Sequence, residues 1–132
     1  MPDSVAFDYA IIRVVPRVDR EEFVNAGVLM MCQSRRYLSA RIELDRKRLA
    51  ALDATLDPET VEQYLSAVER ICAGGDPAGP LGRLSQRERF DWLVAPRSTI
   101  IQTSPVHSGL CTDPEAALEH LLDTVVRPLR AG

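Results

Sequence analysis

Three segments near the start of the chain are dense in apolar and β-branched residues, and they predict three consecutive strands. Residues 6–15 and 28–32 are apolar at both alternating sets of positions, which is typical of central strands covered on both faces. Residues 37–44 alternate instead, with four apolar positions on one face: Leu38, Ala40, Ile42 and Leu44. A strand with one polar face is expected near a sheet edge. Residues 99–103 predict a short fourth strand, and its pairing partner stays open.

The connection between the first two strands carries the signals of a loop followed by an irregular strand entrance. Residues 17–22 are charged, and residues 23–27 lead into the second apolar run. Asn25 and Gly27 adopt positive φ at low cost, so a bulge or turn is expected at this entrance.

The other apolar positions recur with helical spacing. Asp45 is expected to cap a short helix over residues 46–53. Two Asp-Pro-Glu sequences, at residues 57–59 and 113–115, each predict the start of a helix. Each combines a cap, a proline in the first turn and an early acidic residue. A capping-box pattern at residues 85–88 predicts another helix, over residues 86–95. Residues 73–82 are rich in Gly and Pro and are interpreted as a loop.

The order of these elements predicts an α+β fold. Three strands joined by short connections favour an antiparallel β-meander, and the fourth, late strand and three to four helices pack with it. With 132 residues, 45% of them hydrophobic and 27% charged, the chain fits a single soluble domain over residues 1–132. Because the first strands are apolar on both faces, a homodimer is one way to supply cover.

Two features indicate a cytoplasmic protein without a membrane segment. No apolar run approaches the roughly 20 residues that span a bilayer, and the N-terminus lacks the basic and apolar parts of a signal peptide. The three cysteines are odd in number and widely spaced, so reduced thiols are expected at Cys32, Cys72 and Cys111.

The charges are unevenly distributed along the chain. The net charge is −3, yet residues 13–48 sum to +4 and residues 49–78 to −5, and all but one of the 16 cations are arginine. Nucleic-acid binding through the arginine-rich first half is a minor alternative, against which the acidic total and the 5% of aromatic residues argue. The arginines of the basic segment either line one sheet edge as an anion-binding patch or form an exposed solubilising surface.

Two parts of the sequence offer candidate chemistry for an anion. Residues 96–109 interleave the fourth strand with polar side chains: Arg97, Ser98, Gln102, Thr103, Ser104 and His107. An arginine fork, hydroxyls and an imidazole together suit a bound anion, whereas the alternative is that these residues only form turns. Arg13, within a central strand, needs a partner, for which the candidates are Glu21, Glu22 and Glu43.

Catalytic and metal-binding motifs are not recognisable. His107, Cys111 and His120 offer metal-binding atoms, but their spacing matches no known site. Ser104, His107 and Asp113 lack the context of a nucleophile elbow, and no glycine-rich phosphate loop is present. The sequence therefore predicts no catalytic residue, no metal and no cofactor.

Parts of the chain nevertheless resemble a known family. Residues 9–16 and 20–29 are similar to the opening of the bacterial domain-of-unknown-function family 3037, and residues 95–105 are similar to its end. The shared Glu-x-x-Asn-x-Gly-Val pattern consists of Glu22, Asn25, Gly27 and Val28. The resemblance implies no activity and no catalytic residues. Because such proteins are often encoded beside HipA-like kinases, it implies a companion or regulator of such a kinase.

Two functions of different classes follow. The leading hypothesis is a non-enzymatic interaction or regulatory module for a protein partner, such as the HipA-like kinase. The alternative is a small enzyme or ligand-binding domain for a phosphate-containing or other anionic substrate. Its expected site consists of Arg13, Glu22, Asn25, Arg97, Gln102, Ser104 and His107.

Overall fold

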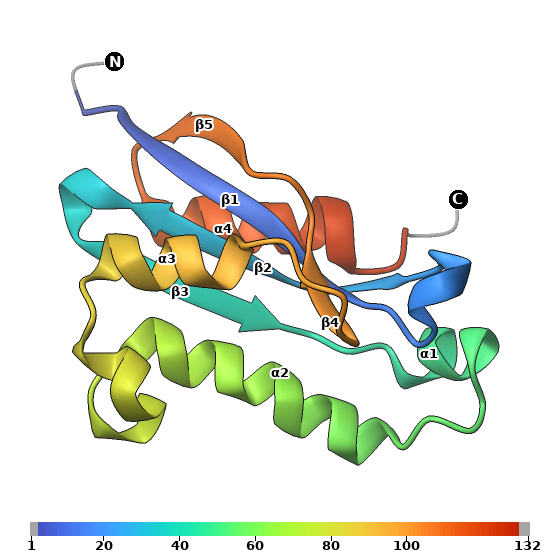
Figure 1. The fold of residues 1–132 in the computed structure, drawn as a ribbon. Helices are drawn as coiled ribbons and strands as arrows, with labels where there is room; N and C mark the ends of the chain where they lie inside the picture. The colour runs from blue at the N-terminus through green and yellow to red at the C-terminus, as the bar shows by residue number, and fades with distance from the viewer. Residues whose placement is uncertain (1–2, 130–132) are drawn as a thin grey trace.

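An antiparallel sheet forms the centre of the computed structural model, which describes residues 3–129. The five strands are β1 (Val5–Val14), β2 (Val24–Cys32), β3 (Tyr37–Ile42), β4 (Ile101–Thr103) and β5 (His107–Cys111). They lie in the order β3-β2-β1-β4, and β5 also pairs with β1 (Figure 1). The predicted α+β class and the antiparallel meander are thus confirmed, with β1 and β2 central and β3 at an edge.

The pairing of the late strand, left open by the sequence, is with β1. β4 pairs with residues 12–14, and β5 continues the same edge along residues 5–9. β5 was not predicted from the sequence, because His107–Cys111 contains neither β-branched residues nor an apolar alternation. Pairing with a long central strand, rather than local propensity, places these residues in the sheet.

A serine bridges the break between β4 and β5. The Ser104 N–H donates to the Ile11 carbonyl at 2.8 Å, and its hydroxyl accepts from the Ile11 N–H at 2.8 Å. The hydroxyl therefore takes the place of a main-chain carbonyl, just before Pro105, which has no N–H to offer. Ser104 is 3% exposed, so this bond is protected from water.

The predicted bulge at the entrance of β2 is confirmed. Ile12 pairs with Gly27 and Arg13 with Asn25, which leaves Ala26 without an opposite residue on β1. The expected reason was wrong, because neither Asn25 nor Gly27 has positive φ. Gly27 instead permits a close approach to β3, since a Cβ there would lie 2.5 Å from the Arg41 carbonyl oxygen.

The helices begin where the capping signals place them. They are α1 (Arg46–Leu52), α2 (Pro58–Ala73), α3 (Gln86–Val94) and α4 (Pro114–Leu121). Each has an N-cap side chain that accepts a backbone N–H of the first turn, from Asp45, Asp57, Ser85 and Asp113 respectively. The capping box of α3 is complete, because the Glu88 carboxylate also accepts the Ser85 N–H at 3.1 Å.

One segment is more ordered than the sequence predicts, and the end of the last predicted helix differs in its helical type. Much of the expected loop at residues 73–82 is a 3₁₀-helical stretch, Asp76–Arg83, interrupted at Gly79 by positive φ. The last helix continues beyond α4 as a π-helical turn, η4 (Leu122–Val126), which ends before Pro128. Short 3₁₀ turns at Val18–Arg20 and Gln33–Arg35 complete the connections.

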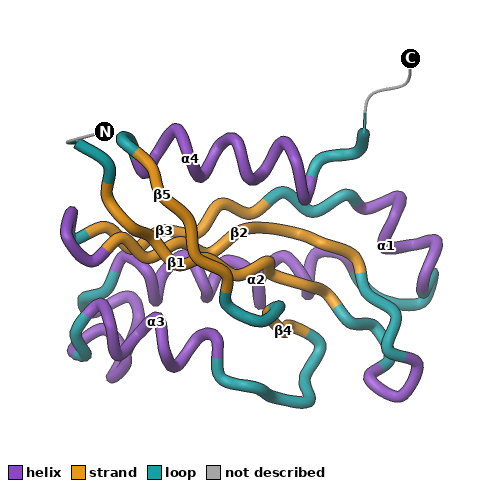
Figure 2. Tube along the Cα trace, turned by 90° about the horizontal axis from the view of Figure 1, so that it is seen from above, coloured by secondary structure: helices purple, strands orange, loops and turns teal. Residues whose placement is uncertain are grey.

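Helices cover both faces of the sheet. α2 and α3 pack on one face, around a core that includes Ile12, Leu29, Leu65 and Phe90. α4 and η4 pack on the other face, against Phe7, Val28 and Met30 (Figure 2). The chain itself thus supplies cover for both apolar faces of β1 and β2.

Two further predictions concern the cysteines and the membrane. All three cysteines are free, and Cys32 and Cys72 are buried. Within residues 3–129, no helix combines the length and the apolar composition needed to cross a membrane.

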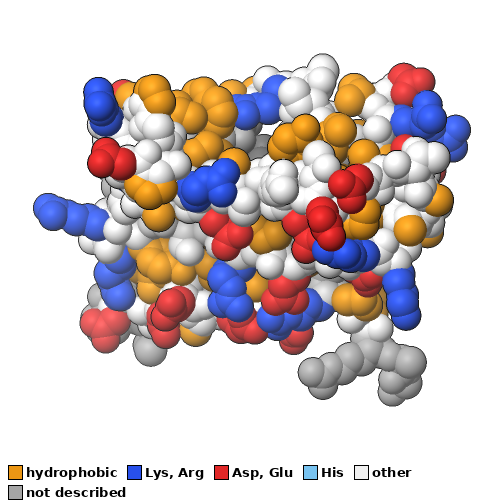
Figure 3. All heavy atoms as spheres, turned by 90° about the horizontal axis from the view of Figure 1, so that it is seen from below, with side chains coloured by type: hydrophobic (Ala, Val, Ile, Leu, Met, Phe, Trp, Pro, Cys, Tyr) orange, Lys and Arg blue, Asp and Glu red, His pale blue; other side chains and the backbone are white. Residues whose placement is uncertain are grey.

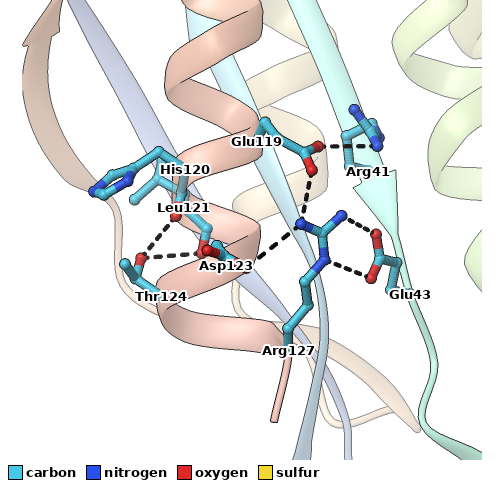
Figure 4. A network of polar contacts seen from close by, with 8 residues as sticks. All are labelled: Arg41, Glu43, Glu119, His120, Leu121, Asp123, Thr124 and Arg127. Carbon is cyan, nitrogen blue, oxygen red and sulfur yellow. Dashed lines mark hydrogen bonds and ion pairs between the residues drawn. The ribbon is translucent and has the colours of Figure 1, made fainter. Parts of the chain in front are cut away.

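An ion-pair network fastens the end of η4 to the edge strand β3. The Arg127 guanidinium donates to both carboxylate oxygens of Glu43, at 2.9 and 2.6 Å, and to Glu119 at 2.7 Å (Figure 4). Glu119 also pairs with Arg41 at 3.1 Å. The hydrogen bond from Arg127 holds the pKa of Glu43 below its ordinary value. The network is therefore strongest while both carboxylates are ionised.

We expect the contribution of Arg127 to stability to disappear in acid. Because the pKa of Glu43 is lower in the folded protein, its pairing stabilises the fold above the unfolded pKa of about 4.3 and is lost as the pH falls through the folded pKa. Arg127→Gln should therefore lower the melting temperature at pH 7, and the difference from wild type should close towards pH 3. Thermal melts from pH 3 to pH 7 measure this. A difference that does not depend on pH would contradict it.

Candidate binding site

A cavity of about 470 Å³ lies between α2, α3 and the segment that leads into β4. Ile12 and Leu29, from the two central strands, line it from the sheet. Its volume falls within the range of 300–1,000 Å³ that is common for ligand sites. It lies on the face that carries α2, where apolar side chains reach the surface in patches between acidic and basic ones (Figure 3).

The two helices contribute walls through regular spacing. Tyr64, Val68 and Ile71 follow each other at intervals of four and three residues, which places them on one side of α2. Trp92 and Leu93 face them from α3. Tyr64 and Trp92 are only partly covered, at 52% and 42% exposure, so large apolar surfaces are left open at the mouth.

One cation lies at the mouth of the cavity. The Arg97 guanidinium carbon is 4.3 Å from the centre of the Trp92 ring, a cation–π arrangement. Arg97 also donates to the carbonyls of Trp92 and Ala95. Among the ion pairs of residues 3–129 none involves Arg97, so its charge is not neutralised by a carboxylate of the described chain.

Local hydrogen bonds fix the segment opposite α2. The Thr99 hydroxyl donates to the Ile101 carbonyl at 2.8 Å, and the Gln102 side-chain amide donates to the Thr99 carbonyl at 2.9 Å. Thr99, Gln102 and Thr103 line the cavity, together with Ile100 and Ile101. The wall is therefore built by consecutive residues, 99–103, and offers hydroxyl groups beside an apolar interior.

The seven residues predicted for an anion site do not gather in one place. Arg97 and Gln102 lie at the cavity. Arg13 is the register partner of both Asn25 and Gln102, so the structure brings these three predicted residues into one row across β2, β1 and β4. On that face of the sheet the Asn25 side chain donates to the Val125 carbonyl of η4 at 3.0 Å. Glu22 lies in the loop before β2 and pairs with Arg20 at 2.5 Å.

The other two predicted residues serve the sheet. Ser104 holds the broken edge through its bonds to Ile11. His107 lies on β5 with its ring centre 5.4 Å from that of Tyr9. Tyr9 and Arg13 are four residues apart on β1, so their neighbours are separated by roughly 13 Å along the strand.

The expected acidic partner of Arg13 was wrong. Glu22 pairs with Arg20 and Glu43 with Arg127, and no ion pair to Arg13 occurs in the part of the chain that the structure describes. Its guanidinium carbon instead lies 4.1 Å from the centre of the Phe23 ring. An aromatic face thus meets the cation where a carboxylate was predicted.

Neither a metal cluster nor a reactive Cys72 thiol is found among the described residues. From Asp3 to Leu129, no three His, Cys, Asp or Glu side chains lie together as a metal site. Burial raises the pKa of the Cys72 thiol to about 12, so this thiol is neutral near pH 7.

A comparison with protein-family models gives one match over most of the chain. The model described as "Protein of unknown function (DUF3037)" matches residues 9–126. The chain belongs to this family. Searches of curated proteins and of solved structures gave no match. The DUF3037 match runs from β1 to the end of η4, so it includes every element that lines the cavity.

Sequence reasoning missed the aromatic mouth of this DUF3037 protein. Tyr64 and Trp92 are both open to solvent at the cavity, and neither is among the candidate site residues taken from the sequence. The available signal was weak: Tyr64 belongs to the helical apolar stripe, and Trp92 is the only tryptophan of the chain. Only the position of β4 decides that these side chains border a hollow.

Proposed function

We propose that this DUF3037 protein is a non-enzymatic interaction module that binds a protein partner through the cavity between α2, α3 and β4. The cavity carries the proposal: it is lined mainly by apolar side chains and has Arg97 at its mouth. Such a site suits a large apolar side chain of a partner with an acidic residue nearby.

The energetics support an anchor of this kind. Full burial of a Leu or Phe side chain contributes about 1.5–3 kcal/mol. Aromatic residues and arginine are enriched among the residues that dominate binding energy at interfaces, and Tyr64, Trp92 and Arg97 are of these types. A partner residue that covers Trp92 would also remove water from its contact with Arg97 and strengthen it.

The partner to test first is the kinase-like protein that the family resemblance implies. We propose that the two proteins meet in the cytoplasm, where the three free thiols of this chain stay reduced. In this arrangement the DUF3037 protein contributes a binding surface and no chemical step.

Filling the cavity is expected to weaken partner binding at least tenfold. Ala67 lines the cavity from α2, so an Ala67→Phe side chain would occupy the space that the partner needs. Binding is measured by titrating the protein with a HipA-like kinase of the kind that the family resemblance implies and recording the fluorescence of Trp92, the only tryptophan of the chain. A change in emission with wild type and a tenfold weaker response with Ala67→Phe are expected.

Glu69→Phe provides the matched control. It places the same aromatic group on the same helix, at an exposed position that does not line the cavity. Its binding should equal that of wild type. Absence of binding at micromolar kinase, or equal binding by wild type and Ala67→Phe, would refute the proposal.

A further inference from the structure

The edge strand β4 has main-chain groups that point away from the sheet. The Val15 N–H donates to the Ile100 carbonyl at 2.7 Å, and the Ser104 N–H donates to the Ile11 carbonyl at 2.8 Å. Hydrogen-bonded pairs alternate along an antiparallel ladder, so Arg13 and Gln102 form the pair between these two. The N–H and C=O groups of Ile101 and Thr103 therefore face outwards.

These outward groups are largely free to bind another chain. No strand pairs with β4 on its outer side in the described part of the protein. The Ile101 carbonyl accepts the Thr99 hydroxyl, which leaves the Ile101 N–H and both main-chain groups of Thr103 at the open edge. A short edge of this kind is a template for one added strand.

The same edge borders the cavity. Ile101 is the register partner of Val14, and Thr103 that of Ile12, so both project towards the face covered by α2 and α3. Both also line the cavity. Side chains of a strand added beside β4 would alternate, and every second one would point to the cavity face.

We infer that the partner binds as an extended segment that adds a strand to the outer edge of β4. A bulky apolar side chain of this segment enters the cavity, and a carboxylate side chain pairs with Arg97, which has no acidic partner in the described chain. This inference rests on the proposed function and names its mode of recognition, in which main-chain bonds give affinity and a side-chain pocket gives specificity.

The neighbouring strand β5 is a weaker template for such a segment. It continues the same edge, but Pro105 interrupts the row of donors between the two strands, and the cavity is lined from β4 and not from β5. An added strand is therefore confined to a few residues beside β4, and much of its affinity must come from the side chain in the cavity.

The test begins with selection of random twelve-residue peptides displayed on phage against the full chain. Enriched peptides should share a large apolar residue close to an acidic one. The strongest is then synthesised with each backbone amide methylated in turn. If the peptide adds a strand, methylation at every second amide around the apolar residue should weaken binding at least tenfold, and methylation at the others should leave it unchanged.

A variant of the protein provides the complementary test. Thr103→Pro removes the outward N–H at the edge, whereas the bonds to β1 are made by Ile100, Gln102 and Ser104. It should weaken the peptide at least tenfold. The methylated peptides use unaltered protein, so they decide the question even if Thr103→Pro does not fold.

The outcomes separate this inference from the proposed function. Binding that Ala67→Phe abolishes, but that shows no alternating methylation pattern, would overturn strand addition and leave the cavity as the binding site. Binding that ignores both changes would overturn the two together. No enriched sequence, or a dimer of this chain that the peptide dissociates, would also overturn the assignment of this edge to an acidic partner segment.

Discussion

Arg89→Met is expected to lower the free energy of unfolding by about 3 kcal/mol. Arg89 lies on α3 and is 8% exposed. Its guanidinium donates to the carbonyls of Ile71 and Cys72, at 2.7 and 2.6 Å, and to that of Leu84 at 3.1 Å. Methionine would keep much of the apolar packing but would leave three carbonyl oxygens without these donors.

The position of these carbonyls explains the size of the effect. Ile71 and Cys72 lie in the last turn of α2, where carbonyls have no partner within the helix and carry the negative end of the helix dipole. The buried Arg89 cation donates hydrogen bonds to these carbonyls and also offsets the negative end of the dipole. Gly74 ends α2 with φ of 76°, and a Cβ there would lie 3.0 Å from the Arg89 guanidinium, so the helix end and the arginine fit closely.

Denaturation with urea measures the loss, and Arg87→Met is the control. Arg87 lies on the same helix but is half exposed, with ion pairs to Asp8 at 3.3 Å and Asp91 at 3.2 Å. Exposed pairs of this kind contribute at most about 1 kcal/mol. Equal losses for the two variants would show that the bonds of Arg89 to the α2 carbonyls do not stabilise the fold.

The contrast between Arg89 and the helix starts shows what the sequence can predict. An N-cap and its target N–H are two or three residues apart, so Asp57 or Ser85 is recognised without knowledge of the fold. Arg89 caps carbonyls 17 and 18 residues away, beyond residues 73–82, for which the sequence predicted only a loop. An N-cap can be predicted from residues close together in the sequence, whereas this C-terminal cap depends on the packing of α3 against α2.

The candidate site divides in the same way. The sequence singled out Arg97 and Gln102, because polar residues beside a predicted strand are visible as a local pattern. It joined Arg97 to Arg13, Asn25 and Gln102, whose common register across β2, β1 and β4 places them on the face opposite to α2 and α3. The partner of Arg13 was predicted from charge alone, and the nearby Phe23 ring was not considered.

The cavity itself had no signature in the sequence. It exists because β4 is only three residues long and lies at an edge, so that residues 99–103 border a hollow beside α2 and α3. The pairing of β4 was the topological question that the sequence left open. The features from which we propose binding thus follow from that single pairing: the aromatic mouth, the cation beside it and the free strand edge.

Gly27→Ala is expected to lower the free energy of unfolding by about 2–3 kcal/mol, because it forces β2 and β3 apart. The new Cβ would lie 2.5 Å from the Arg41 carbonyl oxygen and 2.9 Å from Cδ1 of Ile42. The first of these contacts is with backbone, which cannot move without disturbing the pairing of Gly27 with Ile42. The bulge at Ala26, next to Gly27, would be strained as well.

Gly109→Ala in β5 separates this effect from the general effect of a methyl group in the sheet. Its Cβ would lie 2.7 Å from the Phe7 ring, but the ring is the far end of a side chain and can turn away. We expect its loss in urea denaturation to stay near 1 kcal/mol, the lower end of the range for overpacking. If Gly27→Ala lost no more than Gly109→Ala, the backbone contact with Arg41 would not be the reason for glycine at this position. A loss two to three times larger would establish that the spacing of β2 and β3 requires it.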